Sequence, residues 1–292
     1  MSELRFDGKV VAITGAGQGV GRAYALAFAR RGAKIVANDL AEEALDALVR
    51  QIGEEGGEAI AHRTSIATAE GGESLTAAAL DAWGRIDVLI HNAGILRDAT
   101  FAKLAPEQLE AVMAVHLLGA FHTAQPAFRW MKENGGGRIL LTSSASGLFG
   151  NFGQSNYAAA KLGMVGLVRV LALEGIKYGI HSNAISPYAN SGLTGGDMSD
   201  DALLSPANIA PTALVLCHGD CPSNGEIYQT AAGWTGRVVI GLTEGYALTD
   251  KKSPEELFAH WEAVRSSPTH ELATAKDLVG VLKAKLGVDS LQ

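Results

Sequence analysis

The sequence predicts an α/β fold: a doubly wound, Rossmann-like parallel sheet with helices on both faces. Three observations predict it. Short apolar segments alternate with longer amphipathic ones, the short segments are apolar throughout, and a glycine-rich turn follows the first of them. Strands that are buried on both faces have continuous apolar runs, and the helices between them let such strands pair in parallel. A fold of this kind binds its ligand at the carboxyl ends of the strands.

The order of the elements follows from the same alternation. Strands are expected at residues 9–14, 33–38, 58–62, 86–91, 138–143, 180–185 and 226–231, and helices at 20–31, 41–55, 67–83, 106–131 and 156–177. Residues 190–206 are rich in glycine, serine and aspartate, which predicts a loop or lid. Two helical patterns near the end predict a short C-terminal helical extension. We therefore expect one α/β domain over residues 1–252, which carries the motifs described below, and an extension of that domain over residues 253–292.

Composition excludes several classes of function. The chain has 292 residues, with 24 Lys and Arg against 31 Asp and Glu, so its formal charge of −7 argues against a nucleic-acid partner. No apolar run reaches the roughly 18 residues of a membrane helix, so no membrane partner is expected. No signal peptide or peroxisomal address is recognisable, which favours a cytoplasmic location. Cys217, His218 and Cys221 fall short of the four ligands of a structural zinc site, and no metal is expected.

A glycine-rich turn joins the first strand to the first helix. Glycines let the backbone approach a pyrophosphate, which rests on the free N–H groups at the helix N-terminus. A plain tight turn is the alternative, but the position after the first strand favours a dinucleotide. The residues of this turn expected to bind it are Gly15, Gly17, Gln18, Gly19, Val20 and Gly21.

Asp39 ends the second strand, where a carboxylate can accept hydrogen bonds from the adenosine ribose. It would also repel a 2′-phosphate, and no Lys or Arg follows it closely. NAD is therefore the expected cofactor rather than NADP, although a solvated turn aspartate is the alternative. The remaining residues expected to line the cofactor site are Leu40, Ser65, Ile66, Asn92, Ala93, Gly94 and Pro187.

Tyr157 and Lys161 are four residues apart on a predicted helix, so they share one face of it. A phenol that acts as a base near neutrality needs its pKa lowered by about three units, or ~4 kcal/mol. One cation about 4 Å away supplies that much at an effective dielectric constant near 20. Ser144 follows the fifth strand, where its hydroxyl can hold a substrate oxygen. An ordinary helix surface and a simple strand end are the alternatives.

These motifs occur in an order that resembles the short-chain dehydrogenase/reductase family over residues 9–194. The resemblance implies that Tyr157 is the general base, that Ser144 orients the carbonyl, and that Lys161 binds the nicotinamide ribose. His116 stands where the family has an asparagine that holds a relay water, and a histidine can also carry a proton. The family also implies a homodimer or homotetramer.

Further stretches, NAGILRD at 92–98 and SSASGLFGNFGQSNY at 143–157, resemble one subgroup. It comprises the (3R)-hydroxyacyl-CoA dehydrogenase units of peroxisomal type 2 multifunctional enzymes, also called 17β-hydroxysteroid dehydrogenases type 4. The resemblance implies NAD-dependent oxidation of (3R)-3-hydroxyacyl-CoA to 3-oxoacyl-CoA. The small-molecule substrate is thus acyl-CoA or steroid-like, and Leu148, Phe149 and Phe152 are expected either to line its pocket or to pack in the core.

Three alternative functions stay open. A hydroxysteroid dehydrogenase and a 3-oxoacyl-carrier-protein reductase belong to the same enzyme class, but the reductase usually prefers NADP, which Asp39 disfavours. An NAD-binding sensor or scaffold belongs to a different class. It would not need Ser144, Tyr157 and Lys161 together.

Overall fold

The computed structural model describes residues 3–190, 202–249 and 252–286. The chain forms two compact units, Met1–Arg237 and Val238–Gln292, which are described here one after the other. The loop expected at 190–206 lies mostly outside the described residues.

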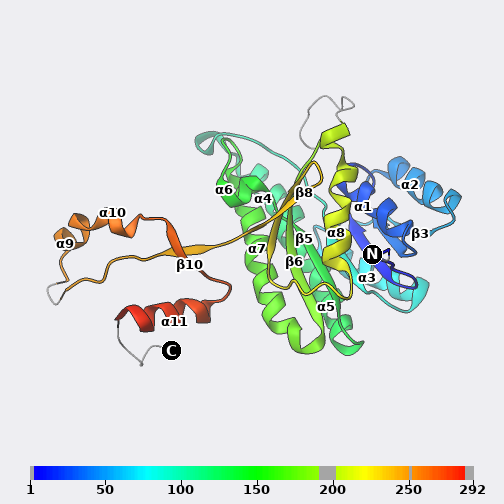
Figure 1. The fold of residues 1–292 in the computed structure, drawn as a ribbon. Helices are drawn as coiled ribbons and strands as arrows, with labels where there is room; N and C mark the ends of the chain where they lie inside the picture. The colour runs from blue at the N-terminus through cyan, green and yellow to red at the C-terminus, as the bar shows by residue number, and fades with distance from the viewer. Residues whose placement is uncertain (1–2, 191–201, 250–251, 287–292) are drawn as a thin grey trace. The chain divides into compact units, whose positions relative to one another are not determined.

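The first unit is built on one large sheet with the strand order β3-β2-β1-β4-β5-β6-β7-β8 (Figure 1). Its first seven strands pair in parallel. The strands are β1 (Val10–Thr14), β2 (Lys34–Asn38), β3 (Glu58–His62), β4 (Val88–His91), β5 (Gly137–Thr142), β6 (Ile180–Tyr188), β7 (Ile227–Ala231) and β8 (Trp234–Val238). Strand order reverses direction between β1 and β4, which makes the carboxyl ends of these two strands the expected ligand site.

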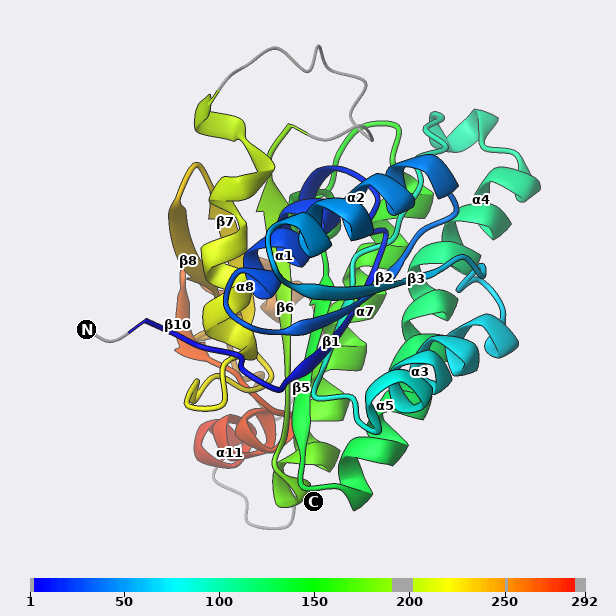
Figure 2. The same cartoon turned by 90° about the vertical axis from the view of Figure 1, so that its right-hand side faces the viewer.

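Helices cover both faces of this sheet (Figure 2). The first layer, which shares a core with β1 and β2, contains α1 (Gly19–Ala29), α2 (Glu42–Glu54) and α8 (Ala210–Cys217). The second contains α3 (Ala69–Trp83), α4 (Pro106–Met113), α5 (Gly119–Glu133) and α7 (Ser155–Gly175), with α6 (Ala145–Phe149) packed on α7. The β1 strand is buried at every residue, as the continuous apolar run predicts. The predicted fold class is confirmed.

Two features of this unit differ from the elements expected. The helix expected at 106–131 is divided into α4 and α5 by a π-helical turn, Ala114–Leu118. A π-turn is a rare single-turn insertion that leaves the chain helical on both sides, so one continuous helix was expected here. The chain also adds β8 after a two-residue turn. Ala232 and Gly233 both have positive φ there, the conformation of a tight hairpin.

The second unit contains a small antiparallel pair, β9 (Gly241–Thr243) and β10 (Pro268–Glu271). Its helices are α9 (Pro254–Ala259), α10 (Trp261–Val264) and α11 (Ala275–Leu286), where two helical patterns were expected. Glu244 pairs with both His270 and Lys285, which ties the strand pair to α11. The division into residues 1–252 and 253–292 stays a prediction. In the described part of the chain, no helix has the length and apolarity needed to cross a membrane.

Candidate active site

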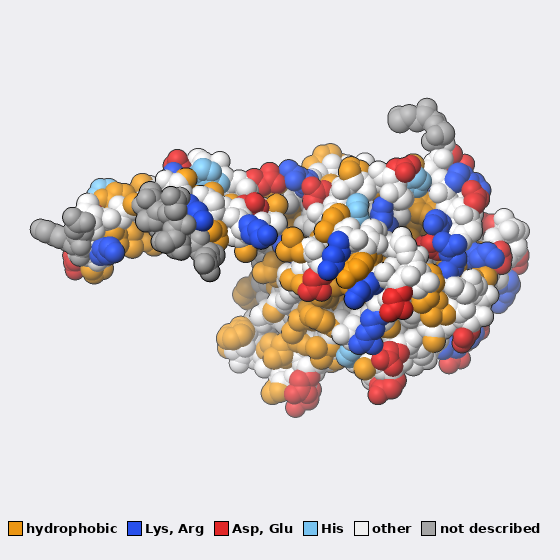
Figure 3. All heavy atoms as spheres, turned by 90° about the horizontal axis from the view of Figure 1, so that it is seen from below, with side chains coloured by type: hydrophobic (Ala, Val, Ile, Leu, Met, Phe, Trp, Pro, Cys, Tyr) orange, Lys and Arg blue, Asp and Glu red, His pale blue; other side chains and the backbone are white. Residues whose placement is uncertain are grey.

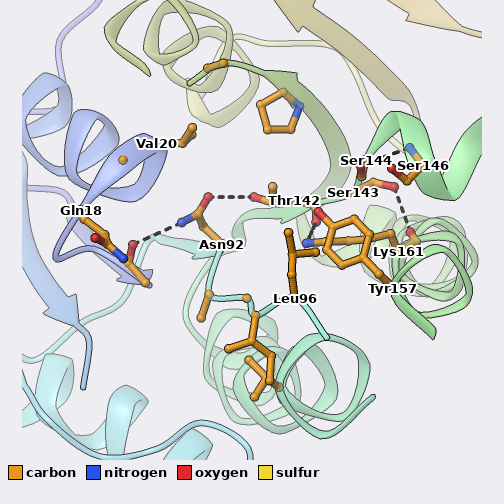
Figure 4. Close-up of a pocket in the computed structure, with 18 of the residues that line it drawn as sticks. Gln18, Val20, Asn92, Leu96, Thr142, Ser143, Ser144, Ser146, Tyr157 and Lys161 are labelled. Atoms are coloured by element: carbon orange, nitrogen blue, oxygen red, sulfur yellow. Dashed lines mark hydrogen bonds between the residues drawn. The ribbon is translucent and has the colours of Figure 1, made fainter. Parts of the chain in front are cut away.

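A cleft of about 1080 Å³ opens at the carboxyl ends of the strands in the first unit. Figure 4 shows Gln18 and Val20 at one end, Ser144, Tyr157 and Lys161 at the other, and Asn92 between them. Sixteen residues singled out from the sequence line this cleft: Gly15, Gln18, Gly19, Val20, Asp39, Leu40, Ser65, Ile66, Asn92, Ala93, Gly94, Ser144, Phe149, Tyr157, Lys161 and Pro187.

The glycine-rich turn packs closely against the turn after β4. A Cβ at Gly21 would overlap the carbonyl oxygen of Gly15, and one at Gly15 would lie 2.7 Å from the Ala93 Cα. Asn92 Nδ2 donates to the Gly15 carbonyl at 3.3 Å, which fixes the two turns together. Gly17 and Gly21 therefore shape the turn without lining the cleft.

The start of α1 provides free hydrogen-bond donors for an anion. Its N-cap residue, Gln18, makes no side-chain cap, and no acidic residue lies in the first turn. A helix N-terminus with uncapped N–H groups and a positive dipole end favours a phosphate group. This turn therefore fits the pyrophosphate of a dinucleotide.

Asp39 is held rigidly at the end of β2. One carboxylate oxygen accepts from the Gly17 N–H at 2.8 Å and the other from the Ala41 N–H at 3.0 Å. Each oxygen has a further lone pair that can accept from a ribose hydroxyl. Among the described residues that line the cleft, Lys161 is the only Lys or Arg, and it lies at the opposite end from Gln18.

Lys161 joins α7 to the end of β5 and is almost completely buried. Its Nζ donates to the Thr142 carbonyl at 2.6 Å, and the Ser143 hydroxyl donates to the Lys161 carbonyl at 2.9 Å. Burial lowers the pKa of the ammonium group to about 7. Its Nζ lies 5.5 Å from the centroid of the Tyr157 ring, so the two side chains are adjacent as the spacing predicts.

The pKa of Tyr157 differs from the sequence-based expectation. Burial raises it above the ordinary value of 10, a hydrogen bond with Ser144 lowers it, and the charge of Asp98 raises it. The expected lowering by Lys161 does not dominate in the free protein. Both groups are desolvated, which disfavours the phenolate and the ammonium alike.

His116 lies in the centre of the π-helical turn and is buried beside Tyr157. The two rings meet edge to face, with centroids 5.1 Å apart. His116 Nε2 lies 2.9 Å from the Ile95 nitrogen and 2.8 Å from the Ile95 oxygen, whereas its buried Nδ1 has no hydrogen-bond partner among the described residues. Burial lowers its pKa well below 6.5. The ring is therefore neutral at physiological pH.

His91, the last residue of β4, is buried and contacts this region. Its Nε2 lies 3.1 Å from the His116 carbonyl oxygen and its Nδ1 lies 3.2 Å from the Thr123 hydroxyl. Thr14 Oγ1 accepts from the Asn92 and Ala93 N–H groups at 2.9 and 3.0 Å. These contacts hold the turn after β4 and the π-helical turn in place.

Of the three aromatic and aliphatic residues expected in the substrate pocket, Phe149 alone lines the cleft. Leu148, its neighbour on α6, is half-buried and does not line the cleft. Phe152 is 88% exposed on the following loop. The sequence interpretation missed Leu96, Gln154, Tyr188 and Leu204, which also line the cleft. Gln154 lies three residues before Tyr157, and this closeness in sequence is the one feature that could have singled it out.

Residues 9–201 match the family model described as short chain dehydrogenase. The chain belongs to the short-chain dehydrogenase/reductase family. It is therefore an oxidoreductase of a family that uses NAD or NADP and acts on small molecules.

The family's relatives include larger enzymes. Over 278 residues, 90% of this chain, it is 46% identical to the mouse peroxisomal multifunctional enzyme type 2. The structure of full-length peroxisomal multifunctional enzyme type 2 from Drosophila melanogaster matches 97% of the chain at 38% identity, with a TM-score of 0.84. The chain spans 37% of the mouse protein's length and 50% of the fly chain. A 7α-hydroxysteroid dehydrogenase with NADH and 7-oxo glycochenodeoxycholic acid matches 80% of this chain and 98% of its own at 30% identity, with a TM-score of 0.74.

The expected cytoplasmic location is wrong. The mouse and Dictyostelium relatives, and those from Neurospora and Saccharomyces, are all named as peroxisomal enzymes. The expectation rested on the absence of recognisable targeting motifs, and such an absence does not identify a compartment.

The lowered pKa of Lys161 predicts how folding stability changes with pH. The unfolded chain keeps this proton up to about pH 10.5, but the folded protein keeps it only up to about pH 7. The unfolded state therefore binds more protons between these values, and stability rises with pH across this window. Lys161→Met removes the effect. In urea unfolding, the free energy of the wild type should increase relative to that of Lys161→Met above about pH 7. A difference that does not change with pH would contradict the prediction.

Proposed function

We propose that the protein oxidises (3R)-3-hydroxyacyl-CoA to 3-oxoacyl-CoA with NAD as the cofactor. The observation that carries the proposal is the convergence of Ser144, Tyr157 and Lys161 at one end of a cleft whose other end suits a dinucleotide. The likeness to peroxisomal multifunctional enzymes, whose dehydrogenase units the stretches at 92–98 and 143–157 resemble, supports the substrate class. A sensor or scaffold is disfavoured because binding alone requires no buried base.

Each of the converging side chains has a separate role in the proposed reaction. Ser144 holds the substrate oxygen, and Tyr157 accepts the proton of the alcohol. Lys161 contacts the cofactor ribose and lowers the energy of the phenolate once ligands exclude water from the cleft. When bound, oxidised nicotinamide accepts the hydride and adds a positive charge near the phenol. As a further part of the proposal, His116 passes the proton on: its ring lies against Tyr157, and its Nδ1 has no hydrogen-bond partner among the described residues.

The lining of the cleft favours an apolar group, such as an acyl chain, as the part of the substrate to be held. Leu96, Phe149, Tyr188 and Leu204 come from four separate segments and present mainly apolar surface. An apolar wall contributes binding energy without requiring a specific polar group. The hydroxysteroid alternative rests on the relative that binds a bile acid, and it is kept as an arm of the assay.

We also propose that the protein forms a homodimer or homotetramer. Leu162, Val170 and Leu173 are about half exposed and recur at helical spacing along α7, with Phe121 of the neighbouring α5 also exposed. Figure 3 shows hydrophobic side chains gathered on the surface of the larger unit. Exposed apolar faces of this kind are typical of subunit contacts.

Tyr157→Phe should reduce turnover by about 10²–10⁴-fold, since it removes the oxygen that takes the proton and keeps the ring. NAD binding should persist, because the glycine turn and Asp39 are unchanged. The assay follows NADH absorbance with 3-hydroxyacyl-CoA esters, 3-hydroxyacyl carrier protein and hydroxysteroids as separate substrates. Lys161→Ala should weaken both turnover and cofactor binding. If folded Tyr157→Phe retains most of its activity, the base is another group. Turnover of steroids alone would refute the proposed substrate.

Asp39 should make NAD preferred over NADP by more than tenfold in kcat/KM, which needs only ~1.4 kcal/mol of repulsion between a carboxylate and a phosphate. Asp39→Ala should narrow this ratio, chiefly by improving the use of NADP. The measurement is kcat/KM for each cofactor with one fixed substrate. Equal efficiency of the two cofactors in the wild type would exclude the assigned role of Asp39.

A further inference from the structure

Gln154 connects the two segments that flank the catalytic tyrosine. Its side chain is only 9% exposed, and it precedes α7, three residues before Tyr157. Its Oε1 accepts from the Ser146 hydroxyl at 2.8 Å and from Asn151 Nδ2 at 3.0 Å. Its Nε2 donates to Asp98 Oδ2 at 2.8 Å.

The partners leave this amide a single orientation. Asp98 offers only acceptors, so it must face the NH₂ group, while Asn151 Nδ2 can only donate and must face the oxygen. The Ser146 hydroxyl consequently donates its proton to Gln154. A side chain fixed at both ends in this way is held in one rotamer with little residual freedom.

Backbone contacts reinforce the connection between the segments. The Ala99 N–H donates to the Gly153 carbonyl at 2.9 Å, beside an isolated parallel bridge between Ala99 and Gln154. Asn156 Nδ2 donates to the Arg97 carbonyl at 3.0 Å. The segment after β4, which carries Asp98, is thereby fastened to the start of α7.

The connection reaches the catalytic serine through Ser146. The Ser146 N–H donates to Ser144 Oγ at 3.2 Å, and the Ser144 hydroxyl in turn lowers the pKa of the Tyr157 phenol. Figure 4 shows Ser144 and Ser146 side by side at the start of α6, near Tyr157. With one lone pair of Ser144 Oγ engaged by this N–H, its hydroxyl proton is directed elsewhere, towards the phenol or the substrate oxygen.

We infer that Gln154 is a positioning residue, which orients the Ser144 hydroxyl through Ser146 and holds the Asp98 carboxylate at a fixed place beside the active site. This inference rests on the proposed function, because it assigns Gln154 a part in the reaction of Tyr157. Gln154 and Asp98 act through other residues and do not touch the reacting atoms.

The fixed carboxylate has an electrostatic consequence. The ionisable groups around Tyr157 in the described structure are Lys161 from α7, His116 from the π-helical turn and Asp98 from the segment after β4. His116 is neutral, so Lys161 and Asp98 act on the phenolate with opposite signs. Asp98→Asn keeps an acceptor for Gln154 Nε2 but removes the charge, so the oxidation rate should reach its plateau at lower pH.

Variants of Gln154 and Asp98 test whether the hydrogen bonds of Gln154 are needed for turnover. Gln154→Met keeps the volume and removes all three side-chain bonds, so kcat should fall about tenfold or more while the Kd for NAD changes less than about twofold. Gln154→Glu brings two carboxylates together and should lose activity most strongly at high pH. Combining it with Asp98→Asn restores every contact, because the amide at position 98 donates to the carboxylate at position 154, so kcat should recover.

Gln108→Met is the control. It removes a single side-chain bond, in which Gln108 Oε1 accepts from the Ala105 N–H, at a place away from Ser144 and Ser146. It should leave kcat within about twofold of the wild type.

The outcomes separate this inference from the proposed function. If Tyr157→Phe is inactive and Gln154→Met retains wild-type kcat, the positioning role is refuted and the base assignment stands. The role is also refuted if the double variant is no more active than Gln154→Glu, or if Gln154→Met lowers thermal stability, NAD affinity and kcat together. If folded Tyr157→Phe retains activity, the proposed function fails whatever Gln154 does.

Discussion

Two bonds between Lys161 and the end of β5 attach α7 to the sheet at the cleft. Nζ reaches the Thr142 carbonyl, and the Ser143 hydroxyl reaches the Lys161 carbonyl, so one residue is held at both its side chain and its backbone. Tyr157 is one helical turn away and takes its position from this attachment. Ser144 is the next residue along the chain from Ser143. The positions of Ser144 and Tyr157, the proposed catalytic residues, thus depend on one junction between a strand end and a helix.

This junction holds the side chains in fixed positions, but its burial disfavours their charged forms. Lys161 is buried, and its pKa falls to about 7, while burial raises that of Tyr157 and lowers that of His116. In the free protein the phenol therefore holds its proton firmly. Under the proposed function, a cofactor that brings positive charge to the same end of the cleft would make the desolvated site suited to base catalysis, because a low local dielectric strengthens that interaction.

Much of the site could be predicted because it depends on local patterns. The glycine turn, Asp39 and the Tyr157–Lys161 spacing each need particular residue types at fixed places in a strand-turn-helix order. The seven parallel strands followed from continuous apolar runs. The sign of the Tyr157 shift could not be predicted, because it depends on burial by elements far apart in sequence. The π-helical turn, β8 and the role of Gln154 were missed for a similar reason: no period or short motif encodes a contact such as that between Asp98 and Gln154.

The desolvated Tyr157–Lys161 pair can be examined directly by nuclear magnetic resonance, with ¹³C-labelled tyrosine and Tyr157→Phe to assign the signal. The account predicts that in the free protein Tyr157 titrates above pH 10, its ordinary value. Added NAD should move the titration to lower pH. A Tyr157 signal that titrates below pH 10 without any cofactor would contradict the claim that burial controls this site before ligands bind.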